Sequence, residues 1–195
     1  MKKFAVIAAV MTLAVAAPVV AQSYDDTIEG YEATTVDMDL GKMMVVRIGI
    51  MEWTSDEDRQ AMFAAFKESG SDGIAAFLRQ QAEKGFVKFP DRPAYQMRYA
   101  HQFEKDGKRF VIMATDRPDK YIDTAPGSKT DDQPLTLLKL ELDPAKGKGE
   151  GAMLFTAALT IDDDGKLTIT TIGTQPTRFT KVTQKKPKQE KKKKG

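Results

Sequence analysis

The chain of 195 residues contains no cysteine and no asparagine, and His101 is its single histidine. The absence of cysteine excludes disulfides, thiol nucleophiles, cysteine-ligated zinc and iron–sulfur clusters. A single histidine also excludes any site that requires two or more imidazole groups. We therefore predict a fold that is held by packing alone, without a resident metal or cofactor.

Long hydrophobic runs are also scarce, since 41% of the residues are hydrophobic and 30% are charged. This balance excludes wholesale disorder and a multi-span membrane protein, and it favours a soluble globular domain.

The longest mainly apolar run, residues 4–17, follows two lysines and precedes the small residues Val19 and Ala21. It is shorter than the roughly 20 residues that span a bilayer, and small residues at these positions are typical of a cleavage site. We predict a signal peptide over residues 1–21, a mature chain from Gln22, and export to the periplasm or the cell exterior. An uncleaved anchor or a buried helix is the alternative.

The charge of the mature chain is balanced in total but uneven along its length. Removing the two lysines of the signal peptide from 30 basic residues leaves 28, which equals the 28 acidic residues. Residues 184–195 are rich in lysine and have no apolar side chain to bury, so we predict a disordered tail there. This tail could bind an anionic envelope surface, whereas sequence-specific nucleic-acid binding is not expected without aromatic side chains for stacking. The lysines assigned to it are Lys185, Lys186, Lys188, Lys191, Lys192, Lys193 and Lys194.

Alternating hydrophobicity predicts strands along most of residues 22–183, which we assign to a single β-rich domain. In the first strand, Val36, Met38 and Leu40 share one face. The next strand, residues 43–51, is almost continuously apolar, which predicts that both of its faces are covered.

One segment, residues 55–84, has helical periodicity instead. Thr54 and Ser55 offer a capping residue followed by three acidic side chains. The apolar side chains that recur at helical spacing are Met62, Phe63 and Phe66. Serine and glycine residues at 69–73 interrupt this helix, and apolar side chains then outline a second one. We predict a helical hairpin that packs on the sheet.

Two β-hairpins have turn sequences that determine their register. Asp-Gly at positions 106–107 predicts a two-residue turn, which places Phe103 opposite Phe110. The sequence Asp-Asp-Asp-Gly predicts a second hairpin with a bulged three-residue loop. That loop sets Ile161 opposite Leu167, whereas a two-residue turn would put the apolar side chains on opposite faces.

These patterns predict an α+β fold that is mostly antiparallel β. We expect a strongly curved sheet, a sandwich or a partly open barrel of about seven to nine strands with one inserted helical hairpin. Residues 116–134 are rich in proline and aspartate and predict a long loop. In a compact domain such a loop is typically a lid, a binding loop or a disordered segment.

His101 is the first candidate for chemistry, because the usual pKa of histidine suits a general base and because Tyr99 lies on the same strand face. Asp116 and Arg117 end the partner strand, where an arginine can bind a carboxylate or a phosphate. One hypothesis is a hydrolase or isomerase that uses His101 with Asp116 or Arg117. The alternatives are an ordinary half-buried sheet position for His101 and a turn or internal ion pair for Asp116 and Arg117. The candidate catalytic residues are thus His101 and Asp116, and the candidate ligand-binding residues are Tyr99, His101 and Arg117.

Two further motifs are interpreted as connections. Residues 146–151 resemble a phosphate-binding loop in composition, but such a loop opens a helix, whereas the sequence that follows predicts a strand. The acidic run at 162–165 would need a glutamate at the twelfth position of a calcium loop, where Gly173 stands instead. Neither motif predicts a ligand site.

Several segments combine into a wider pattern across residues 44–182. They are the run from Trp53 through the helical segment, Arg98 to His101, Ala114 to Pro118, Gly147 to Gly151, and Gln175 to Phe179. In this combination the chain resembles small exported bacterial proteins of unknown function. The resemblance implies export but no activity, ligand or catalytic residue, and it leaves the lysine-rich tail outside.

The leading functional hypothesis is a non-enzymatic exported module that binds a small ligand or an envelope partner. Curved sheets with covering helices enclose apolar cavities, and methionine side chains give such cavities adaptable walls. The methionines concerned are Met38, Met43, Met44 and Met51. We expect the site at the end of the sheet that is bounded by the helical hairpin and residues 116–134.

Overall fold

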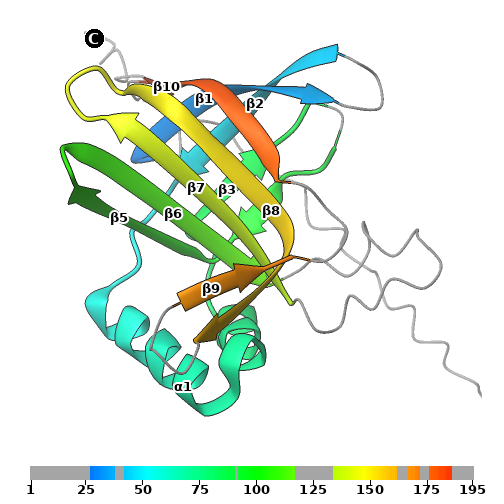
Figure 1. The fold of residues 1–195 in the computed structure, drawn as a ribbon, viewed down its shortest axis with the longest axis vertical. Coiled ribbons are helices and arrows are strands. Elements are labelled where there is room, and N and C mark those ends of the chain that lie inside the picture. The colour runs from blue at the N-terminus through cyan, green and yellow to red at the C-terminus, as the bar shows by residue number, and fades with distance from the viewer. Residues whose placement is uncertain are drawn as a thin grey trace, which may run out of the picture.

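The computed structural model describes residues 27–37, 42–90, 92–116, 134–161, 167–171 and 176–185. Within these ranges, ten antiparallel strands form one sheet, and one helix packs on it (Figure 1). The elements are β1 (Glu29–Asp37), β2 (Lys42–Ile50), α1 (Asp56–Arg79), β3 (Gly85–Lys88), β4 (Tyr95–Met97), β5 (Tyr99–Lys105), β6 (Lys108–Asp116), β7 (Leu135–Asp143), β8 (Lys148–Ile161), β9 (Leu167–Thr170) and β10 (Thr177–Lys185).

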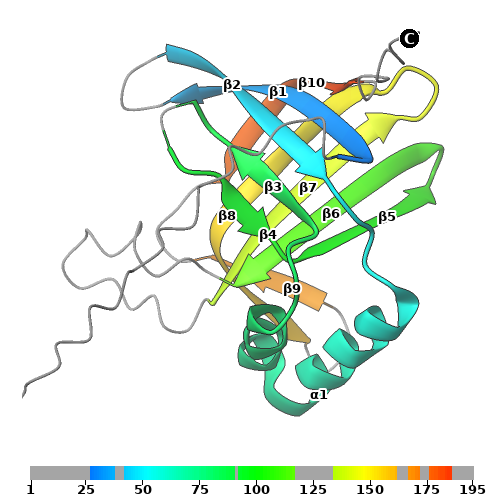
Figure 2. The same ribbon diagram turned by 180° about the vertical axis from the view of Figure 1, so that it is seen from behind.

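The sheet has the strand order β4-β3-β2-β1-β10-β8-β7-β6-β5, and β9 pairs with the end of β8. Its two outermost strands, β4 and β5, follow one another in the chain with Arg98 alone between them, so the sheet curves round until its two edges meet (Figure 2). The sheet stays open, because β4 pairs with β3 and β5 with β6. The prediction of a mostly antiparallel curved sheet is confirmed. The predicted count of about seven to nine strands was too low, since the sheet has ten.

The inner face of the curved sheet forms the main hydrophobic core. Alternate side chains from nearly every strand point into it, as expected for strands with one buried face. Its largest fully buried members are Tyr31, Ile48, Ile50, Met97, Met113, Leu138, Leu140, Leu142, Met153 and Phe179. This core, rather than any covalent link, holds the two halves of the sheet together.

The first two strands differ from the predicted pattern. The buried face of β1 contains Tyr31 and Ala33, whereas Val36 is exposed. In β2, Met43 and Val45 are 71% and 54% exposed, so this strand is covered on one face for most of its length. The expectation of two covered faces was wrong because α1 contacts β6, β7 and β8 and does not lie over β2.

Both predicted hairpin registers are confirmed. Phe103 pairs with Phe110 across β5 and β6, and both turn residues have positive φ, 53° at Asp106 and 70° at Gly107, as a two-residue turn of this kind requires. Ile161 pairs with Leu167 across β8 and β9. The acidic turn between those two residues lies outside the described residues.

The predicted helical hairpin is replaced by one bent helix, α1. Its N-terminus is capped by the Ser55 side chain, which accepts a hydrogen bond from the Asp58 backbone amide at 3.1 Å. Ser69 and Gly70 leave helical geometry, with φ of 58° at Gly70, and the helix resumes directly after them. The interruption was therefore located correctly, but it produces a kink and no loop. At the kink, the Ser71 hydroxyl accepts from the Leu159 amide at 2.6 Å, which anchors the bend to β8.

A second hydrophobic core lies between α1 and the outer face of the sheet. The second half of the helix supplies Ile74, Ala75 and Leu78, which pack with Tyr99, Ala114, Leu135 and Ala157. Figures 1 and 2 show α1 at one end of the sheet, where β6 and β7 reach it. The helix therefore borders the end of the sheet where the binding site was predicted.

Candidate functional site

The structure does not bring the predicted catalytic pair together. His101 lies on β5 opposite Ile112, whereas Asp116 is four residues further along β6. At roughly 3.3 Å per residue in a strand, this separation is about 13 Å, well beyond hydrogen-bond reach. Arg117 lies outside the described residues. The His101 and Asp116 side chains are therefore not placed to act together in one mechanism.

His101 belongs to a row of rings on the outer face of the sheet. Its ring centroid lies 6.4 Å from that of Tyr99 and 6.2 Å from that of Phe103, and Phe103 stacks on Phe110 at 5.1 Å. Burial lowers the pKa of His101, and the positive charge of Arg59 on α1 lowers it further. These features agree with the alternative interpretation of His101 as a half-buried sheet residue.

The pKa of His101 should therefore lie below the ordinary value of 6.5 when followed by NMR titration of its ring protons. Arg59→Gln should raise the pKa without restoring 6.5, because burial is the larger cause, and Asp56→Asn should lower it, because the Asp56 carboxylate favours the charged ring. With a lowered pKa in the folded state, His101 binds a proton more readily in the unfolded chain than in the folded one. The free energy of unfolding should therefore decrease as the pH falls from 6.5 through the folded-state pKa. A pKa above 6.5 would contradict this account.

Asp116 takes part in an ion-pair network at the end of α1. Its carboxylate lies 3.5 Å from Nε of Arg79 and 3.8 Å from Nε of Arg98. Arg98 also donates to three backbone carbonyls near the C-terminus of the helix, those of Leu78, Arg79 and Gln81, at 3.4, 2.6 and 3.1 Å. Helix C-termini leave such carbonyls without partners, so the Arg98 side chain fastens α1 to the junction of β4 and β5.

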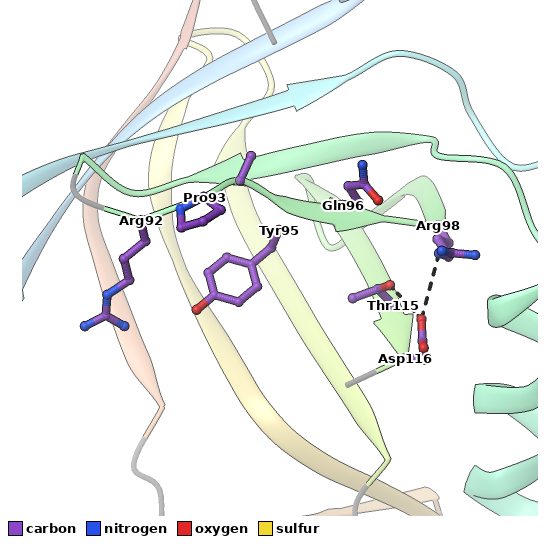
Figure 3. Close-up of a pocket in the computed structure, with 8 residues that line it drawn as sticks. Arg92, Pro93, Tyr95, Gln96, Arg98, Thr115 and Asp116 are labelled. Carbon is purple, nitrogen blue, oxygen red and sulfur yellow. Dashed lines mark hydrogen bonds and ion pairs between the residues drawn. The ribbon is translucent and has the colours of Figure 1, made fainter. Parts of the chain in front are cut away.

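A cleft of about 270 Å³ opens beside this network, between β4 and the end of β6, and we call it the β4–β6 cleft. Its lining residues are Arg92, Pro93, Ala94, Tyr95, Gln96, Arg98, Thr115 and Asp116. Figure 3 shows Arg92 and Tyr95 toward one end of the cleft and the paired Arg98 and Asp116 at the other. The predicted site was bounded by the helical segment and residues 116–134. The cleft lining includes Asp116 from that boundary and no residue of α1.

The side chains at the Arg92 end are held in place by their neighbours. The Lys88 ammonium donates to the Arg92 backbone carbonyl, which fixes the short connection before β4. The Tyr95 ring lies 6.0 Å from Phe89 and 5.4 Å from Phe155. The Arg92 guanidinium, in contrast, has no ion-pair partner among the described residues.

Sequence reasoning missed Arg92 as a site residue. The signal that could have identified it is its position in the sequence Pro90-Asp91-Arg92-Pro93, where two prolines restrict the backbone around a charged side chain.

A second polar cluster closes the opposite end of the inner face, and we call it the Glu29–Arg109 cluster. Arg109 donates to both carboxylate oxygens of Glu29, at 2.7 and 2.6 Å, and through Nε to Gln102 at 2.8 Å. Gln184 on β10 donates to the same carboxylate. Burial and the nearby Glu29 charge raise the pKa of Tyr31 well above its usual value. The cluster joins β1, β5, β6 and β10, which indicates a structural role.

The remaining predicted motifs take these positions. Within residues 146–151, Gly147 ends the turn before β8, and a strand rather than a helix follows, as predicted.

Lys185 was assigned to the disordered tail, but it is the last residue of β10 and forms an ion pair with Glu32. β10 continues beyond the predicted boundary because Gln184 pairs with Tyr31 of β1. The other tail lysines lie outside the described residues, and so does Met38.

The predicted methionine walls do not line the β4–β6 cleft. Met43 is exposed, and Met44 is partly buried against the main core. Among the described residues, no group of three or more histidine, aspartate or glutamate side chains is placed to hold a metal ion. In the same part of the chain, none of the helical structure has the length and apolar character needed to traverse a bilayer.

Comparison with protein-family models, with curated proteins and with solved structures found no match to this chain. The resemblance to small exported bacterial proteins therefore stays a prediction.

Proposed function

We propose that this chain is an exported binding protein that holds a small ligand in the β4–β6 cleft. The observation that carries the proposal is the cleft itself, which combines an aromatic ring, two arginines and a carboxylate in about 270 Å³. Ligand sites typically combine apolar walls with a few convergent polar groups. The predicted signal peptide over residues 1–21 supports the exported location.

The polar groups of the cleft favour binding over catalysis. The Asp116 carboxylate lies within ion-pair distance of two arginines, Arg79 and Arg98, so it is already engaged with neighbouring side chains. His101, the residue best suited to proton transfer, does not line the cleft. The walls come from strands and from an anchored turn, and such rigid elements position a ligand without a conformational change.

The test is native mass spectrometry of the protein purified from the cells that produce it. We expect a mature mass that begins at Gln22 and a noncovalent adduct of small mass. Ala94→Phe, which adds a ring to the cleft wall, should remove the adduct, because the added ring occupies part of the volume of about 270 Å³. Ala152→Phe, on the outer face of β8, is the matched control and should retain it. An adduct that survives Ala94→Phe, or no adduct at all, would contradict the proposal.

A further inference from the structure

We propose that the ligand of the β4–β6 cleft is a small organic anion with a single carboxylate, and that the Arg92 guanidinium binds this carboxylate. The inference rests on the proposed function and names its ligand class. It depends on which of the two arginines is available, on the charge of Asp116, and on the size and polarity of the walls.

Arg92 is the available arginine in the cleft. Arg98 donates to three carbonyls at the end of α1 and lies beside Asp116, so its guanidinium is already occupied. The Arg92 guanidinium has no such partner within the described ranges, and its backbone is fixed by Lys88. A planar guanidinium offers two parallel donors, which match the two oxygens of a carboxylate.

Asp116 limits the charge that the cleft accepts. Its carboxylate lines the cleft together with Arg92 and Arg98, so one negative and two positive side chains give the lining a net charge of +1. A monoanion that lies against Arg92 keeps the lining close to neutral. A dianionic phosphate would leave the lining with a net negative charge, which is unfavourable in a partly desolvated site.

The other walls define the rest of the ligand. Pro93, Ala94 and the Tyr95 ring provide an apolar surface next to Arg92, as Figure 3 shows for the labelled side chains. A volume of about 270 Å³ lies just below the range typical of sites for drug-sized molecules. It fits a compound with about one ring.

The experiment is an NMR titration of the full mature chain with four one-ring probes at constant ionic strength. Benzoate carries one carboxylate, benzyl alcohol is neutral, benzylamine is a cation, and phenyl phosphate is a dianion. We expect benzoate to bind most tightly and to shift the backbone amides of Tyr95, Gln96 and Thr115. Phenyl phosphate should bind more weakly than benzoate, because its second negative charge gives the cleft lining a net negative charge.

Arg92→Gln should weaken benzoate binding by about tenfold or more, since a charge-assisted pair is lost, and should leave benzyl alcohol unaffected. Arg92→Lys keeps the charge without the planar fork, so its affinity should be intermediate. Arg178→Gln removes an exposed arginine of β10 outside the cleft and should leave benzoate binding unchanged. The amide spectrum of each variant reports whether the fold is intact.

Three results would overturn the carboxylate assignment. Equal binding of benzyl alcohol or benzylamine at the cleft would reject it and leave the binding function standing. Equal loss of affinity in Arg92→Gln and Arg178→Gln would show a non-specific charge effect. Absence of any shift at the cleft with all four probes would also reject it, and the adduct experiment with Ala94→Phe then decides separately whether the cleft binds a ligand.

Discussion

Arg109→Met is expected to lower the free energy of unfolding by about 3 kcal/mol. The substitution removes the arginine on β6 that pairs with the Glu29 carboxylate of β1. A buried charge that loses its partner in this way costs about 3–5 kcal/mol. We expect the lower end because the Glu29 and Arg109 side chains are 11% and 17% exposed. Urea unfolding followed by the fluorescence of Trp53, which packs against the main core, measures the change.

The double variant Glu29→Met with Arg109→Met is the control for this prediction. Removing both charges leaves no unpaired carboxylate, so the double variant should be more stable than Arg109→Met alone. A loss below about 1 kcal/mol in Arg109→Met would match an exposed ion pair instead. That result would mean that the Glu29–Arg109 cluster does not hold the end of the sheet.

Phe179→Ala is expected to destabilise the fold by about 3–5 kcal/mol, the range for removing a fully buried aromatic ring. Phe179 is 1% exposed on β10, and its ring centroid lies 6.3 Å from that of Phe89. β10 joins the strands on its two sides, β1 and β8, so a cavity there weakens the contact between the two halves of the sheet. Urea unfolding again provides the measurement.

Phe103→Ala is the matched control, since it removes the same ring from the outer surface. Phe103 is 42% exposed and mainly contacts Phe110 and His101. Its loss should cost about 1 kcal/mol, the contribution of an aromatic pair. Similar losses in the two phenylalanine variants would contradict the division into an inner core and an outer aromatic row.

Local features of the fold could be predicted from the sequence because their causes are local. An Asp-Gly pair between alternating strands determines the turn, and the turn determines that Phe103 faces Phe110. Matching of apolar faces selected the register of Ile161 with Leu167. The start of α1 is also a local feature, since a capping residue at position 54 or 55 and the acidic side chains after it predict a helix N-terminus.

Features that depend on long-range closure could not be predicted. The apolar sequence of β2 does not reveal which strands the helix covers. Because α1 packs on β6, β7 and β8 and not on β2, Met43 is exposed, contrary to the prediction. The register opposes Arg109 to Glu104, yet its guanidinium binds Glu29, which is 80 residues away in the chain. The two strands that flank Arg98 pair with different partners, β4 with β3 and β5 with β6, which the alternation along them does not reveal.

Of the residues that line the β4–β6 cleft, the sequence singled out Asp116 and not Arg92. Asp116 at the end of β6 was identified because a charged residue at a strand end is a local signal. Arg92 was missed because its role depends on the position of β4 beside β6, which a single sequence does not reveal. His101 drew attention as the single histidine of the chain, but it does not line the β4–β6 cleft.

The junction at Arg98 also affects how the molecule opens. In an ordinary sheet each outer strand can fray by itself, since it is held on one side alone. Here the Arg98 amide donates to Ala114 of β6, and its side chain holds the last turn of α1. Local unfolding of β4 or β5 breaks these contacts at the helix end as well, so we expect the three elements, which border the β4–β6 cleft, to open together.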